Sequence, residues 1–230
     1  MPMQQLIDVK SIVADTLKIA GLVGQSIEDS VRSLADRDID LAGKVIDRDA
    51  EIDRLKLDID RECIDALAGK LEGRDLRVVL GTYRMIVDLE HIGDYSVSVS
   101  RVTLAVANKP VSGTSLEIMK MAEIAGRMLK KCIDLYSGKT SGNLRTVYEN
   151  DLGIDRLYGS VFYNSLGEIV HEPERSTNII YLIMAARALE RIGDHITEIA
   201  ERVEYIETGQ LKERSVPMHV PYGERDKGWE

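Results

Sequence analysis

The sequence predicts an all-α protein built from two tandem antiparallel three-helix bundles that are related by an internal repeat. Helix-forming residues dominate the 230-residue chain, which contains five prolines and 5% aromatic residues. Apolar residues recur at intervals of three and four along most of the chain, whereas the alternation typical of strands never persists. The phrase Leu-Glu-x-Ile-Gly-Asp occurs at 89–94 and again at 189–194. We therefore expect one helical unit to occur twice.

The first unit is predicted to contain helices at 3–35, 39–70 and 75–107. An apolar stripe with a seven-residue recurrence marks the first helix, and the Asp-Arg-Asp group at 36–38 interrupts it. The turn around Gly73 ends the second helix, because glycine suits the position just past a helix end. The third helix carries two apolar sectors, so we expect its second sector either to pack inside the protein or to form a homodimer face.

The second unit is predicted to contain helices at 115–136, 144–170 and 174–208, separated by polar breaks. A Pro- and Gly-containing segment between the two units marks the boundary. The expected organisation is therefore a first repeat at 1–108, a second repeat at 114–209 and a C-terminal tail at 210–230 without apolar periodicity.

Charge and composition exclude several classes of protein. The net charge of −9 and the lack of a basic block argue against non-specific nucleic-acid binding. No apolar run approaches the roughly 18 residues of a membrane span, and Asp8 and Lys10 make the N-terminus unlike a signal peptide. We therefore expect a cytoplasmic protein. Cys63 and Cys132 are expected to be buried apolar side chains, not a disulfide or a metal site.

Pairs of carboxylates four residues apart recur at matching places in the two units. Such a spacing puts both acids on one helix face, and their repulsion costs a few tenths of a kcal/mol unless a positive charge lies between them. Packing of neighbouring helices can bring two pairs together, and an all-oxygen set suits iron, Mn²⁺, Mg²⁺ or Ca²⁺ better than zinc. The candidate metal ligands are Asp49, Asp53, Glu90, Asp94, Asp151, Asp155, Glu190 and Asp194.

An alternative is that nearby arginines neutralise these acids as surface ion pairs, which contribute little stability. The candidates for this role are Arg54, Arg84, Arg101, Arg187 and Arg191. The periodicity places the acids away from the main apolar seams, so we expect them to face a surface rather than a closed pocket. No arrangement of a nucleophile with a base is evident in the sequence, so no catalytic residue is predicted.

Gly93 and Gly193 occupy the same place in both units, although glycine inside a helix costs about 1 kcal/mol relative to alanine. Close helix packing would account for them, and so would room for a ligand or for a neighbouring backbone beside Asp94 and Asp194; the two explanations are compatible. The histidines beside these phrases do not repeat. We expect His91 and His195 to face solvent or to act as accessory groups, with His195, which directly follows Asp194, as an occasional ligand.

The repeated Leu-Glu-x-Ile-Gly-Asp phrase resembles the PhoU family of phosphate-uptake regulators. The resemblance includes Asp-x-x-Ile-Asp at 49–53 and 151–155 and Asp-Leu-Arg at 75–77, and it covers residues 5–208. It implies two three-helix bundles with pseudo-two-fold symmetry, in which the paired carboxylate motifs bind metal clusters, including iron. The second unit departs from the pattern, with Ser-Thr-Asn at 176–178 in place of Asp-Leu-Arg, and the tail lies outside it.

By resemblance, the protein is expected to be a negative regulator of phosphate uptake. It would be a metal-binding adaptor at the cytoplasmic side of a phosphate ABC transporter, would assist a sensor kinase, and would not be an enzyme. One alternative is a metal-free helical interaction module that acts on another transporter or signalling protein. A carboxylate-bridged metal enzyme is a further alternative, but the chain has a single Glu-x-x-His where a di-iron bundle needs two.

Overall fold

The computed structural model describes residues 8–108 and 115–210. These residues form six long helices and one short 3-10 helix, and no strand occurs among them. The elements in chain order are α1 (Val9–Asp36), α2 (Ile39–Leu67), α3 (Gly73–Val106), α4 (Ser115–Tyr136), α5 (Arg145–His171), η1 (Pro173–Arg175) and α6 (Ser176–Thr208). The predicted all-α class is confirmed.

The first two helices begin where local capping signals define them. Asp8 caps α1 by accepting a hydrogen bond from the Lys10 amide at 3.0 Å, and the predicted start at residue 3 lies outside the described residues. At the other end, Arg37 adopts a left-handed conformation with φ of 58°. Asp38 then caps α2 through the Leu41 amide at 2.9 Å. The short Asp-Arg-Asp break therefore closes one helix and starts the next. The predicted end of the second helix at the Gly73 turn is wrong, because α2 ends at Leu67 and Gly73 is the first residue of α3.

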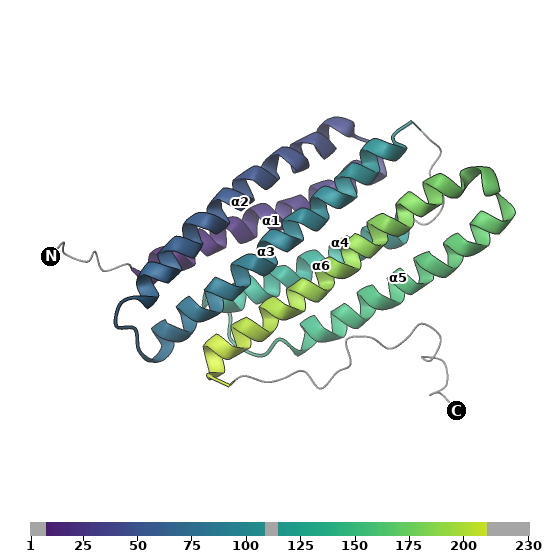
Figure 1. The fold of residues 1–230 in the computed structure, drawn as a ribbon. Coiled ribbons are helices and arrows are strands. Elements are labelled where there is room, and N and C mark those ends of the chain that lie inside the picture. The colour runs from purple at the N-terminus through teal and green to yellow at the C-terminus, as the bar shows by residue number, and fades with distance from the viewer. Residues whose placement is uncertain (1–7, 109–114, 211–230) are drawn as a thin grey trace, which may run out of the picture.

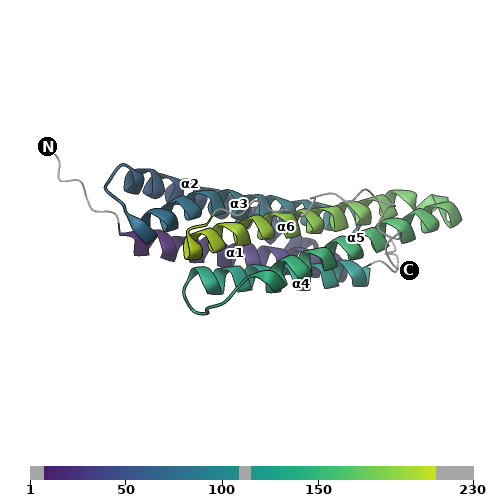
Figure 2. The same cartoon turned by 90° about the horizontal axis from the view of Figure 1, so that it is seen from below.

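Two three-helix bundles lie against each other along α3 and α6. Within each half every helix packs on the other two, and the halves meet through α3 with α6 and through α1 with α4. Figure 1 shows α3 and α6 side by side at the centre, with α2 and α5 on the outer flanks. Figure 2 shows α1 and α4 forming a second layer beneath them. The predicted repeat boundaries at 108 and 114 stay predictions, and residues 211–230 of the predicted tail lie outside the described residues.

A single hydrophobic core runs through both halves and contains residues from all six helices. The second apolar sector of α3 contributes to it through Val79 and Ile86, which are both fully buried. Tyr83 and Val87 of the same sector remain 40% and 37% exposed. Val97 of the same sector is 4% exposed, so three of its five apolar residues pack inside the molecule, which was one of the two arrangements left open by the sequence.

Gly81 of α3 lies directly against Ile206 of α6. A Cβ atom at this position would lie 2.5 Å from Cδ1 and 2.6 Å from Cγ1 of Ile206, a side chain that is 1% exposed. We expect Gly81→Ala to lower the free energy of unfolding by about 1–2 kcal/mol, because overpacking outweighs the gain of about 1 kcal/mol in helix propensity. Urea unfolding measures the effect. Gly126→Ala is the matched control, since no atom lies within 4 Å of its Cβ, and it should be neutral or stabilising.

Cys63 and Cys132 are both free and fully buried, which confirms the prediction of two apolar thiols. Burial raises the pKa of each thiol to about 12. We expect a thiol reagent such as DTNB to leave both groups unmodified in the native protein and to label two thiols per chain after addition of denaturant. Stoichiometric labelling under native conditions would contradict the burial of these side chains.

Candidate functional site

The carboxylate pairs of each half lie on two neighbouring helices. Asp49 and Asp53 belong to α2, whereas Glu90 and Asp94 belong to α3, and these two helices pack together. We call these four residues the first carboxylate cluster. The pKa of Asp49 is raised to about 6 by burial and by the negative charges of Asp94, Asp53 and Glu90, against which Arg101 acts. The two pairs are therefore close enough to repel one another.

The repeated glycine makes room for an aspartate of the preceding helix. A Cβ at Gly93 would lie 3.2 Å from Asp49 Oδ1 and 3.3 Å from Ile52 Cδ1. At Gly193 the corresponding distances are 2.9 Å to Asp151 Oδ1 and 3.2 Å to Cδ1 of Ile154. Close helix packing and space beside a carboxylate are thus one feature. The carboxylate that lies against each glycine is Asp49 or Asp151 of the neighbouring helix, a contact that the sequence did not indicate.

The second carboxylate cluster consists of Asp151 and Asp155 on α5 with Glu190 and Asp194 on α6. Asp151 and Glu190 are each 6% exposed. The predicted surface position is therefore wrong for these two residues, because α5 and α6 pack together at this point. In the first cluster the predicted surface position is correct for Asp53 and Asp94, which are exposed. Asp49 and Glu90 are partly buried.

Two arginines pair with the acids of α6. Arg187 Nη1 donates to Glu190 Oε1, and Arg191 Nη1 donates to Asp194 Oδ2 at 3.1 Å. Burial and the charge of Asp194 raise the pKa of Glu190, whereas Arg187 and Arg191 lower it. The ion-pair alternative is therefore correct for this part of the second cluster. Both pairs are partly shielded from water, unlike the surface pairs that the sequence suggested.

The first cluster has different neighbours. The residues that correspond to Arg187 and Arg191 are Val87 and His91, of which His91 Nε2 lies 3.6 Å from Glu90 Oε2. The repeat is thus symmetric in its carboxylates and asymmetric in the groups that neutralise them.

The first cluster fits a hard cation better than the second. Asp49 Oδ1 is shielded from water and accepts no hydrogen bond within the part of the chain that the structure describes. A shielded carboxylate oxygen without a partner is costly, and a cation bound by several carboxylates would remove that cost. In the second cluster a cation would have to compete with Arg187 and Arg191 for Glu190 and Asp194. Metal binding at the eight predicted ligands stays a prediction.

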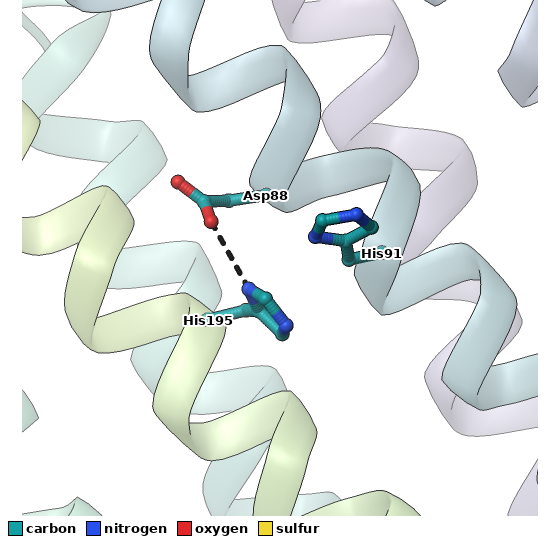
Figure 3. A group of neighbouring side chains, drawn as sticks. All are labelled: Asp88, His91 and His195. Carbon is teal, nitrogen blue, oxygen red and sulfur yellow. Dashed lines mark hydrogen bonds and ion pairs between the residues drawn. The ribbon is translucent and has the colours of Figure 1, made fainter. Parts of the chain in front are cut away.

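The structure also brings together three side chains that the sequence did not connect. His195 Nδ1 lies 3.0 Å from Asp88 Oδ1, and the rings of His91 and His195 are 4.8 Å apart between centroids (Figure 3). Of the two alternatives predicted for these histidines, the solvent-facing one is wrong for His195, whose side chain is 22% exposed. A groove of about 410 Å³ beside these histidines is also lined by Asp94 and Arg101. No local sequence signal could reveal this group, because Asp88 and His195 belong to different repeats.

Comparison with known proteins agrees with this architecture. The PhoU domain model matches residues 16–103 and 118–203. The chain is 32% identical over 222 residues to a phosphate-specific transport system accessory protein PhoU homolog of Rhizobium meliloti, covering 96% of this chain and 90% of that protein. It is 30% identical over 204 residues to the homolog of the same name from Pseudomonas aeruginosa, covering 88% and 84% respectively.

Solved structures show the same fold. The crystal structure of PhoU from Pseudomonas aeruginosa matches with a TM-score of 0.83 and 28% identity, over 87% of this chain and 97% of that one. The phosphate transport system regulatory protein PhoU from Streptococcus pneumoniae matches with a TM-score of 0.79 and 22% identity, over 90% and 98%. The family-model matches span most of both helical repeats, and the relatives align over nearly the whole chain. This protein therefore belongs to the PhoU family.

Proposed function

We propose that the protein is an accessory protein of a phosphate transport system that restrains phosphate uptake. The observation that carries this proposal is the alignment with relatives named as accessory proteins of a phosphate-specific transport system, which extends over 96% of this chain in one case and 88% in the other. The alignment includes both repeats, so it supports a role of the whole molecule. An adaptor without catalytic activity is part of the proposal.

The first carboxylate cluster would provide the metal-binding part of this function. The charges of all three other members raise the pKa of Asp49, so this residue interacts electrostatically with the whole cluster. When bound, a hard cation such as iron, Mn²⁺, Mg²⁺ or Ca²⁺ would neutralise the four acids and hold α2 and α3 together. The second carboxylate cluster would bind more weakly, because its arginines already supply two positive charges.

The partner would be the cytoplasmic side of a phosphate ABC transporter, with a sensor kinase as a second partner. The protein would then work in the cytoplasm, at the inner face of the membrane. Among the described residues, the structure contains no helix that is both long and apolar enough to span a bilayer. The second apolar sector of α3 is not proposed as a homodimer face, because most of it packs inside the molecule.

The regulatory role is tested in the organism that encodes this chain. Deletion should raise phosphate uptake in phosphate-rich medium, and expression of the wild-type protein should restore restraint. Unchanged uptake after deletion would contradict the proposal. Complementation with a Glu90→Gln/Asp94→Asn variant shows whether restraint requires the first cluster.

The metal role is tested separately by elemental analysis of protein purified without chelator. We expect the Glu90→Gln/Asp94→Asn variant to lose metal relative to wild type, whereas Glu123→Gln, at an exposed acid on α4, should retain it. Equal metal in all three proteins would remove the first cluster as a site. Partner binding that is weakened by salt and unaffected by chelator would favour the metal-free interaction module.

A further inference from the structure

We propose that Asp88, His91 and His195 form a binding site for one divalent transition-metal ion at the contact between the two repeats. One ligand atom from each of these residues can be chosen so that all three lie within 4.8 Å of one another. Figure 3 shows Asp88 and His91 on α3 and His195 on α6, with the three side chains around a common space. This site shares no residue with the two carboxylate clusters and does not depend on the proposed function.

The distances already approach those of a coordination site. Asp88 Oδ1 and His195 Nδ1 are 3.0 Å apart. Two ligands at about 2.0–2.1 Å from a tetrahedral zinc ion are separated by roughly 3.3 Å, so a metal could replace the proton between this oxygen and nitrogen with little movement. His91 must approach slightly, which a rotation of its partly exposed side chain would allow.

An ordinary hydrogen bond between Asp88 and His195 does not explain the position of His91. Its Nδ1 atom is shielded from solvent and has no hydrogen-bond partner within the described ranges 8–108 and 115–210. Buried polar atoms usually have a partner, and one left without a partner requires an explanation. A shared metal ion would satisfy this group of side chains together.

The donor set indicates the class of metal. Two imidazoles and one carboxylate suit Zn²⁺, Ni²⁺, Co²⁺ or Fe²⁺, whereas Mg²⁺ and Ca²⁺ prefer oxygen donors only. Two of the three side chains, His91 and His195, also line the groove of about 410 Å³. The groove therefore provides an entry path and room for water molecules at the remaining coordination positions. This preference is opposite to that of the all-oxygen carboxylate clusters.

The site occurs once because the repeat is not symmetric here. The positions equivalent to Asp88, His91 and His195 carry Ala188, Arg191 and Tyr95, of which neither alanine nor arginine is a metal ligand. A metal bound by residues of α3 and α6 would link the first repeat to the second. Binding should therefore stabilise the native arrangement of the two halves as well as the local side chains.

The experiment uses the untagged full-length protein after removal of metal with EDTA and dialysis. The chain contains four histidines, so its ring ¹H–¹³C signals can be assigned by single substitutions. Addition of Zn²⁺ should shift the signals of His91 and His195 with a stoichiometry of one ion per chain. The signal of His171, an exposed residue at the end of α5, should stay in place.

Variants then measure the contribution of each ligand by calorimetric titration with Zn²⁺. His91→Gln, His195→Gln and Asp88→Asn should each weaken binding by at least the roughly 10–100-fold that loss of an outer-shell partner of a ligand costs. His171→Gln is the matched control and should bind as wild type. The Glu90→Gln/Asp94→Asn variant should retain the shifts of both histidine signals, which separates this site from the first carboxylate cluster.

The proposal is overturned if Zn²⁺ leaves the signals of both His91 and His195 in place in the wild-type protein. It is equally overturned if His195→Gln, with a helical circular dichroism spectrum like that of wild type, binds Zn²⁺ with unchanged affinity. Substitution of His171 and His219, which are not ligands of the proposed site, assigns the two remaining ring signals to His91 and His195, so a site variant that fails to fold does not prevent the test.

Discussion

Replacing Asp49 with asparagine is expected to make the metal-free protein more stable at pH 7. The pKa of Asp49 is raised from 3.8 to about 6, first by burial and then by Asp94, Asp53 and Glu90. Ionisation of this carboxyl therefore opposes folding at neutral pH. An uncharged amide of the same shape removes that repulsion. We expect a gain of about 2 kcal/mol in the free energy of unfolding. This is less than the full rise in the pKa of Asp49 implies, because the carboxyl retains some contact with water.

The effect of Asp49 depends on pH in a defined direction. Because its pKa is higher in the folded than in the unfolded protein, the native state binds the proton more tightly. The contribution of this group to stability is greatest below about pH 4 and is lost as the pH rises through about 6. The advantage of Asp49→Asn over wild type should therefore be small at pH 4 and reach its full size near pH 7.

Urea unfolding in the presence of EDTA, at a series of pH values, measures this difference. Asp58→Asn is a suitable control, since Asp58 is an exposed acid on the same helix with 54% of its side chain accessible, and it should change stability by less than about 0.5 kcal/mol. With metal present, wild type should be more stable than Asp49→Asn, because asparagine is a poorer ligand than a carboxylate. An Asp49→Asn protein that is less stable than wild type in EDTA at pH 7 would contradict the electrostatic argument.

Arg48→Met is expected to lower the free energy of unfolding by about 3 kcal/mol. Arg48 on α2 lies 2.8 Å from Asp29 Oδ2 on α1, and only 4% of the Asp29 side chain is exposed. Removal of one partner from a shielded ion pair leaves the other charge without compensation, which typically costs about 3–5 kcal/mol. Arg32 remains in the variant, with its Nη2 atom 2.9 Å from Asp29 Oδ1, so we expect the loss of stability to lie at the lower end of this range.

Two comparisons isolate this buried pair. Arg61→Met removes an exposed partner of Asp58, where 73% and 54% of the two side chains are accessible, so a change of about 0.5 kcal/mol or less is expected. The double variant Asp29→Leu/Arg48→Met should recover much of the loss, because an apolar pair can replace a buried ion pair. Equal destabilisation by Arg48→Met and Arg61→Met, measured by urea unfolding, would show that the buried α1–α2 ion pair contributes no more to stability than an exposed pair.

Much of the candidate site could be predicted from the sequence because it depends on spacing along single helices. The four-residue interval puts Glu90 and Asp94 on one face of α3, and the hundred-residue repeat relates them to Glu190 and Asp194. The paired glycines also pointed to close approach. Neither pattern could indicate that Arg187 and Arg191 would neutralise only the second cluster, because an arginine side chain can turn toward several neighbours.

The sequence alone determined the six helices and the duplicated unit, and it located all eight carboxylates. These features follow from capping residues and apolar periodicity, which act over a few neighbouring positions. The tertiary structure decided which carboxylates are buried and brought Asp88 to His195 across the two repeats. Such contacts depend on how α3 and α6 are rotated against each other, and Gly81 lets the Ile206 side chain of α6 lie against the α3 backbone. That rotation results from packing over the whole core, so no short stretch of sequence contains it.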